Sequence, residues 1–153
     1  MKQPAYIDVM ENWREEFTFF HARTVRFSDL DMFGHLNNTK VFSFFEDARL
    51  EFLKEAGFMT GWMNQQSEQI IVTADLQADY LRQVYFDEQL RVGVKVAGVG
   101  SSSLDLHYVI LNGRNDMCVT GRGAIVQINS KTGSAEPLEE EQRRHLLKIS
   151  SFS

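Results

Sequence analysis

Five polar side chains that could carry out chemistry lie within ten positions of one another: Asp29, Asp31, His35, Asn37 and Asn38. A carboxylate can act as a general base or as a nucleophile, and a histidine can transfer a proton. The segment runs directly into an apolar stretch, and the start of a helix offers N–H groups that lack intrahelical partners. Such donors stabilise negative charge on an oxygen atom. The pattern therefore predicts attack on a carbonyl group beside a helix N-terminus.

The residues after this polar segment predict one long amphipathic helix. Apolar residues recur there at steps of three and four positions: Val41, Phe45, Ala48 and Phe52. Asn37, Asn38 or Thr39 can cap the start of the helix. Gly57 suits the left-handed conformation that follows a helix end.

The rest of the chain predicts mainly strands. One candidate strand precedes the polar segment, and four follow the helix, at residues 17–27, 70–81, 89–99, 104–111 and 118–128. Residues 1–16 form an arm or a short helix, and residues 137–149 a short C-terminal helix. This order predicts an α+β fold in which an antiparallel sheet wraps around one helix. A length of 153 residues predicts a single domain, residues 1–153.

Composition and charge exclude several classes of protein. A net charge of −5 without a basic cluster argues against a nucleic-acid partner. No apolar run approaches the roughly 20 residues that span a bilayer, and the N-terminal segment lacks the apolar region of a signal peptide. The single cysteine, Cys118, excludes an internal disulfide and is expected to be a small buried residue. The four histidines are too scattered for a metal site. We therefore expect a cytoplasmic protein with no membrane span.

The order D-x-D-x-x-G-H-x-N-N, followed by a helix that carries E-D-A-R, resembles the 4-hydroxybenzoyl-CoA thioesterase family, which has the hotdog fold. The matching positions are Asp29, Asp31, Gly34, His35, Asn37, Asn38, Glu46, Ala48 and Arg49. The resemblance covers residues 19–128 and implies hydrolysis of acyl-CoA thioesters to a free acid and coenzyme A. The implied reaction requires no bound cofactor, because coenzyme A is part of the substrate. It also implies a homo-oligomer, a dimer or a homotetramer, with active sites at a subunit interface.

The resemblance places the catalytic carboxylate on Asp31, as nucleophile or as base towards water. Asp29 fits a supporting turn. His35 either orients the loop or transfers a proton. A backbone N–H near Asn38 or Thr39 is expected to face the thioester oxygen, which places Asn38 in the catalytic set.

Further residues are expected at the substrate: Gly34, Asn37, Thr39, Tyr80 and Arg82. Gly34 supplies a backbone angle or a close approach. The segment Tyr80-Leu81-Arg82 is similar to one in the family that usually continues with proline, where this chain has Gln83. Arg82 and Lys95 are candidates for the phosphates of coenzyme A, or are solvated charges.

Several alternatives remain open. In some relatives the catalytic group is a helix carboxylate, here Glu46 or Asp47; Glu46 also lies three positions from Arg49, as in a surface ion pair. A hotdog hydratase would carry D-x-N-P-x-H, which this chain lacks. A non-catalytic hotdog module would bind acyl-CoA or an acyl-carrier protein without turnover. The acyl or aryl group is unspecified, because certain aromatic residues can line a pocket or form the core: Phe33, Phe42, Phe45, Phe58 and Trp62.

Overall fold

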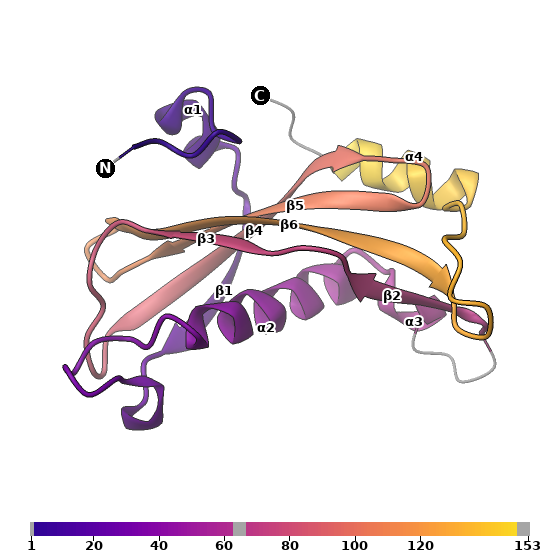
Figure 1. Ribbon diagram of the computed structural model, residues 1–153. Coiled ribbons are helices and arrows are strands. Elements are labelled where there is room, and N and C mark those ends of the chain that lie inside the picture. Colours follow the sequence, from indigo (N-terminus) through magenta and orange to yellow (C-terminus); the bar gives the residue numbers. More distant parts are fainter. Residues whose placement is uncertain (1, 63–66, 150–153) are drawn as a thin grey trace.

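The computed structural model describes residues 2–62 and 67–149, and this part of the chain forms a curled antiparallel sheet around a central helix (Figure 1). The strands are β1 (Phe19–Thr24), β2 (Gln69–Thr73), β3 (Gln77–Tyr80), β4 (Gln89–Val99), β5 (Ser103–Leu111) and β6 (Met117–Asn129). The helices are α1 (Met10–Glu15), the 3-10 turn η1 (Phe27–Asp29), α2 (Lys40–Glu55), α3 (Met59–Trp62) and α4 (Glu140–Ile149). The strands follow the spatial order β1-β4-β5-β6-β2, and β3 also pairs with β6. This is the predicted α+β arrangement.

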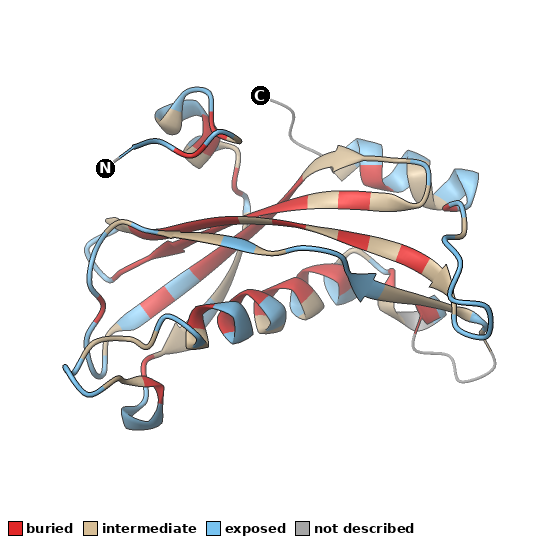
Figure 2. Cartoon of the chain, in the orientation of Figure 1, coloured by how far each residue is buried: buried red, intermediate tan, exposed pale blue. Residues whose placement is uncertain are grey.

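The core lies between α2 and the inner face of the sheet (Figure 2). The predicted apolar stripe of α2 is confirmed, since Val41, Phe45 and Ala48 are at most 1% exposed. The Phe45 ring stacks on Tyr108 of β5 with 4.5 Å between ring centroids. Gly121 of β6 permits this packing, because a Cβ atom there would lie 2.5 Å from the Phe45 ring. The sequence therefore brings α2 close to the sheet at the centre of the molecule.

The strand predicted over residues 70–81 is wrong in one respect, because it is two strands separated by residues 74–76. Thr73 pairs with Ile125, and Gln77 pairs with Arg122, so residues 74–76 face only residues 123–124 of β6, one residue fewer. The extra residue forms a bulge where β6 carries Gly123, at which a Cβ atom would lie 2.5 Å from the Leu76 side chain.

The N-terminal arm packs on the face of the sheet opposite α2 (Figure 1). Trp13 of α1 is fully buried, and its indole N–H donates to Nδ1 of His107 at 2.8 Å. Lys95 of β4 is 3% exposed and donates to the Glu16 carboxylate at 2.6 Å and to the Trp13 carbonyl at 3.0 Å. Burial lowers the pKa of Lys95, and the Glu16 carboxylate opposes that shift. Lys95 is thus enclosed beneath the arm rather than placed to meet a ligand.

Helix α4 covers the end of β4 that β1 leaves unpaired. β1 pairs with β4 only as far as Val94, whereas β4 continues to Val99. Leu146 of α4 is fully buried there. The helix begins at Glu140, three residues later than the sequence predicted. No described helix is long and apolar enough to cross a membrane.

Candidate active site

Asp31 lies in a tight hairpin between η1 and α2. Leu30 and Leu36 form an antiparallel bridge, and the Asp31 N–H donates to the His35 carbonyl at 2.8 Å. Within the turn, Oδ1 of Asp31 accepts hydrogen bonds from the N–H groups of Phe33 at 2.9 Å and His35 at 3.1 Å. The other oxygen, Oδ2, has no hydrogen bond to the described residues. One oxygen of this half-buried carboxylate is therefore fixed by the backbone, and the other is not.

Gly34 and Asp29 shape this hairpin. Gly34 has a φ of 79°, and no atom would lie within 4 Å of a Cβ at that position, so its role is the backbone angle and not a close approach. Asp29 is 4% exposed, and its Oδ2 accepts from the Arg26 N–H at 2.9 Å. The Asp29 carbonyl accepts from the Asn37 N–H at 2.8 Å. Asp29 therefore supports the turn, as the sequence indicated.

Asn37 organises the start of α2. Its Oδ1 accepts from the N–H and the hydroxyl of Thr39, at 3.0 and 2.8 Å, and its carbonyl accepts from the Lys40 N–H at 3.0 Å. Thr39 occupies the N-cap position without a capping bond of its own. Across the hairpin, the Tyr80 hydroxyl donates to the Asn38 carbonyl at 2.8 Å. Asn37 and Tyr80 together fix the two peptide groups that lead into the helix.

The backbone N–H of Asn38 differs from its neighbours in its hydrogen bonding. From Phe33 to Lys40, all the other N–H groups donate to the hairpin, to Asn37 or to Val84, whereas that of Asn38 has no partner among the described residues. Asn38 itself is exposed. The free N–H lies immediately before α2, where the helix dipole favours negative charge.

His35 contributes to the hairpin mainly through its backbone. It forms an antiparallel bridge with Tyr85, and the two rings meet edge to face with 5.2 Å between centroids. Its N–H is one of the two donors to Oδ1 of Asp31. These contacts are those of a residue that orients the loop.

A small pocket of about 190 Å³ adjoins the hairpin and the start of α2. Five aliphatic residues and three polar ones line it: Leu36, Val41, Leu81, Val84, Val119, Tyr80, Arg82 and Gln83. The exposed Arg82 lies 3.9 Å from Asp116, in a loose ion pair at the mouth. The expected residues Tyr80 and Arg82 are therefore adjacent to the hairpin. The aliphatic lining was not predicted, although the position of Val41 directly after the polar segment was a signal for it.

The other candidate residues do not line this pocket. Phe33 is 73% exposed, Phe45 belongs to the core, and Trp62 donates to the buried Gln127. Of the helix candidates, Glu46 is exposed and Asp47 pairs with Arg23 at 2.7 Å.

Two other polar groups of the sequence have structural roles. Arg49 is buried and donates to the Tyr108 hydroxyl at 3.2 Å, so the surface pair with Glu46 is not formed. Burial raises the pKa of the Cys118 thiol to about 11, which disfavours the reactive thiolate.

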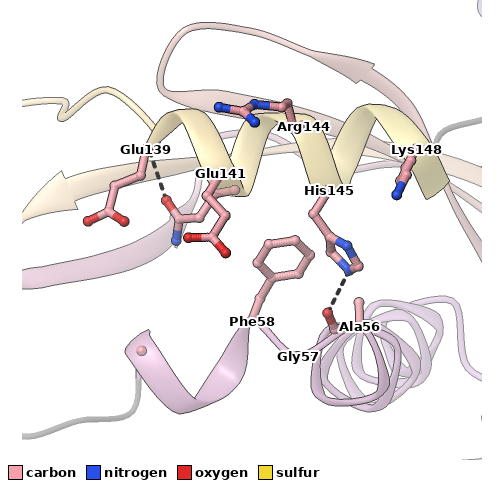
Figure 3. A pocket seen from close by; sticks show the side chains of 10 residues that line it. Ala56, Gly57, Phe58, Glu139, Glu141, Arg144, His145 and Lys148 are labelled. Carbon is pink, nitrogen blue, oxygen red and sulfur yellow. Dashed lines mark hydrogen bonds between the residues drawn. The ribbon is translucent and has the colours of Figure 1, made fainter.

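A larger hollow, of about 690 Å³, lies at the opposite end of α2, between that helix end and α4 (Figure 3). Its lining includes Glu139, Glu141, Arg144 and Lys148, and His145 contacts the Ala56 carbonyl at 2.8 Å. Because α2 has 16 residues, its ends are about 24 Å apart at about 1.5 Å per residue. The hollow is therefore remote from Asp31. Among the described residues, no group of three His, Cys, Asp or Glu side chains could hold a metal ion.

The fold and the hairpin define a hotdog protein of the thioesterase type, and comparisons with known proteins agree. The profile of the thioesterase-like superfamily matches residues 25–146, so the chain belongs to that superfamily. The YsmA protein of Bacillus subtilis (strain 168) is 42% identical over 148 residues, which are 96% of this chain and 98% of that protein.

Solved structures show the same fold. A thioesterase of Thermus thermophilus, complexed with coenzyme A and Zn, is 29% identical, with a TM-score of 0.75 over 88% of this chain and 96% of that one. The DHNA-CoA thioesterase of Staphylococcus aureus has a TM-score of 0.79 over 86% of this chain and 89% of its own, and at 21% identity it shows likeness in fold.

Proposed function

We propose that the protein hydrolyses acyl-CoA thioesters to a free acid and coenzyme A, with Asp31 as the catalytic carboxylate. The observation that carries the proposal is the different hydrogen bonding of its two oxygens. The backbone holds Oδ1, while Oδ2 has no partner among the described residues. Such hydrogen bonds orient the carboxylate without pairing it with a positively charged side chain. The superfamily and a coenzyme A-bound relative make the thioester the substrate that fits best.

Two routes use this geometry. As a base, Asp31 takes a proton from water while the hydroxide adds to the thioester carbon; the tetrahedral intermediate then collapses, the C–S bond breaks, and the sulfur leaves as a thiolate that takes up a proton. As a nucleophile, Oδ2 attacks the carbon directly, coenzyme A leaves, and water hydrolyses the resulting acyl anhydride. Both routes place negative charge on the former carbonyl oxygen.

The free N–H of Asn38 is our proposed donor to that oxygen. Neighbouring donors are engaged in the hairpin, and this one is held in place by Asn37 on one side and by the Tyr80 bond to its own carbonyl on the other. A donor that is fixed before charge develops stabilises the intermediate without reorganisation. His35 then acts by positioning the hairpin.

A subunit interface around the hairpin forms part of the proposal. Large apolar side chains on the hairpin and on the neighbouring loop are more than half exposed: Phe27, Met32, Phe33, Tyr85 and Phe86. Apolar surface of this kind is typical of a contact site. We propose that a second copy covers it in a homo-oligomer. Light scattering that finds a fully active monomer of 17.6 kDa would contradict this part.

The decisive test is release of free thiol from acyl-CoA by the purified protein, measured with a thiol reagent over acetyl, butyryl, hexanoyl, benzoyl and palmitoyl substrates. Turnover well above the spontaneous rate is expected for at least one of them. If calorimetry detects acyl-CoA binding while no substrate releases thiol, the protein is a binding module and the proposed hydrolysis is wrong.

A further inference from the structure

The small pocket beside the hairpin has the character of an acyl site. Of the described residues that line it, five are aliphatic and only Arg82 is charged. The polar Tyr80 is already engaged, because its hydroxyl donates to the Asn38 carbonyl. A pocket with these walls favours an uncharged, apolar group.

Its location connects it to the proposed chemistry. Tyr80 both lines the pocket and bonds the peptide unit next to the free N–H of Asn38. Leu36, on another wall, belongs to the hairpin that carries Asp31 and donates its N–H to the Val84 carbonyl at 2.7 Å. A thioester whose carbonyl oxygen meets Asn38 would therefore direct its acyl group into this pocket.

Three of the residues that line the pocket are buried in the core. Val41, Val84 and Val119 are at most 3% exposed, and all three belong to the core packed between α2 and the sheet. Val119 pairs with Tyr80 of β3 on one side and with Ile110 of β5 on the other. Because protein cores are close-packed, a chain that reaches this wall cannot extend further without displacing core residues.

We propose that the pocket restricts the substrate to small acyl groups, either one aromatic ring or a chain of up to about six carbons, and that Val119 sets the limit. The inference rests on the proposed thioesterase function. The volume is about 190 Å³. An apolar cavity of about 150 Å³ in another protein holds benzene, so a single ring fits and a long fatty chain does not.

The test is a profile of kcat/KM against acyl length, from acetyl- to palmitoyl-CoA with benzoyl-CoA included. For the wild-type protein we expect a maximum among butyryl, hexanoyl and benzoyl, and a fall of about tenfold or more for decanoyl and longer chains, since each ill-fitting methylene group costs about that much in an apolar pocket. Val119→Ala should move the maximum to longer chains, and Val119→Leu to shorter ones. Glu141→Gln, at the remote hollow, is the matched control and should leave the profile unchanged.

The outcomes separate this inference from the proposed function. A maximum at palmitoyl-CoA that neither Val119 variant moves overturns the inference and leaves the thioesterase intact. Absence of thiol release from every substrate overturns both. Circular dichroism verifies that each variant is folded, and because Val119→Ala only removes atoms, it decides the matter if Val119→Leu does not fold.

Discussion

The two ends of α2 share a backbone feature but have very different surfaces. Each end has a glycine with positive φ, Gly34 before the helix and Gly57 after it. At the first end lie a small aliphatic pocket and a hairpin with one carboxylate oxygen and one N–H that have no partner in the described part of the chain. At the second, a hollow more than three times larger has acidic and basic residues in its lining, and the helix end is already contacted by His145. Candidate chemistry follows the arrangement of polar groups rather than the size of the cavity.

Asp31→Asn should have the largest effect on activity, and this result would locate catalysis at the first end of α2. The amide keeps the hydrogen-bond acceptor for Phe33 and His35 but removes the base or nucleophile, so kcat/KM should fall at least about 100-fold while the fold is preserved. Thiol release together with circular dichroism measures both. A variant that retains more than a tenth of the wild-type rate would show that the catalytic group lies elsewhere.

Gly34→Ala and Gly57→Ala form a matched pair that compares the two ends directly. Neither position has an atom within 4 Å of the added Cβ, so each variant bears only the cost of a left-handed backbone, about 1–2 kcal/mol of stability. Denaturation should show similar losses for both. Only Gly34→Ala should also lower kcat/KM, by about tenfold or more, because it displaces the hairpin that carries Asp31, the proposed catalytic residue. Equal losses of activity in both would remove the distinction between the ends.

Tyr80→Phe should have a smaller effect. The variant loses the hydrogen bond to the Asn38 carbonyl, which is worth about 0.5–1.5 kcal/mol and corresponds to about a twofold to tenfold change. The loss should appear in kcat and not in KM, because the bond positions a donor needed in the transition state. A rise in KM with kcat unchanged would instead give Tyr80 a role in substrate binding.

The smallest effect is expected at the remote hollow. Glu141→Gln and Lys148→Gln change exposed charges on α4 (Figure 3) and should leave kcat/KM within about twofold of the wild type. Steady-state kinetics on the best substrate provides the measurement. A loss of tenfold or more in either variant would place part of the substrate site at this end of the molecule.

The sequence predicted those features of the fold that depend on local pattern. The stripe from Val41 to Phe52 places apolar residues on one face of a helix, and these residues are buried as expected. The break at residues 74–76 could not be predicted, because its cause is Gly123, which lies far along the chain on the facing strand. Long-range packing decides such breaks.

The features of the candidate site likewise include some that follow from local sequence and some that depend on long-range packing. The support that Asp29 gives to the turn and the left-handed angle of Gly34 follow from residue type and short spacing. The aliphatic pocket and the burial of Lys95 depend instead on which strands the fold brings together. The sequence made Lys95 a candidate for the phosphates of coenzyme A or a solvated charge, but the N-terminal arm covers it.

The docking of this arm has a consequence for the order in which the chain reaches its native state. Trp13 and His107, which share a hydrogen bond, are 94 positions apart, and Lys95 is 82 positions from the Trp13 carbonyl that it contacts. During synthesis the arm leaves the ribosome before β4 and β5, yet its binding surface exists only after those strands have been made and paired. Contacts of such long range close late in folding. The residues of the arm thus emerge before the sheet and find their partners only after it has formed.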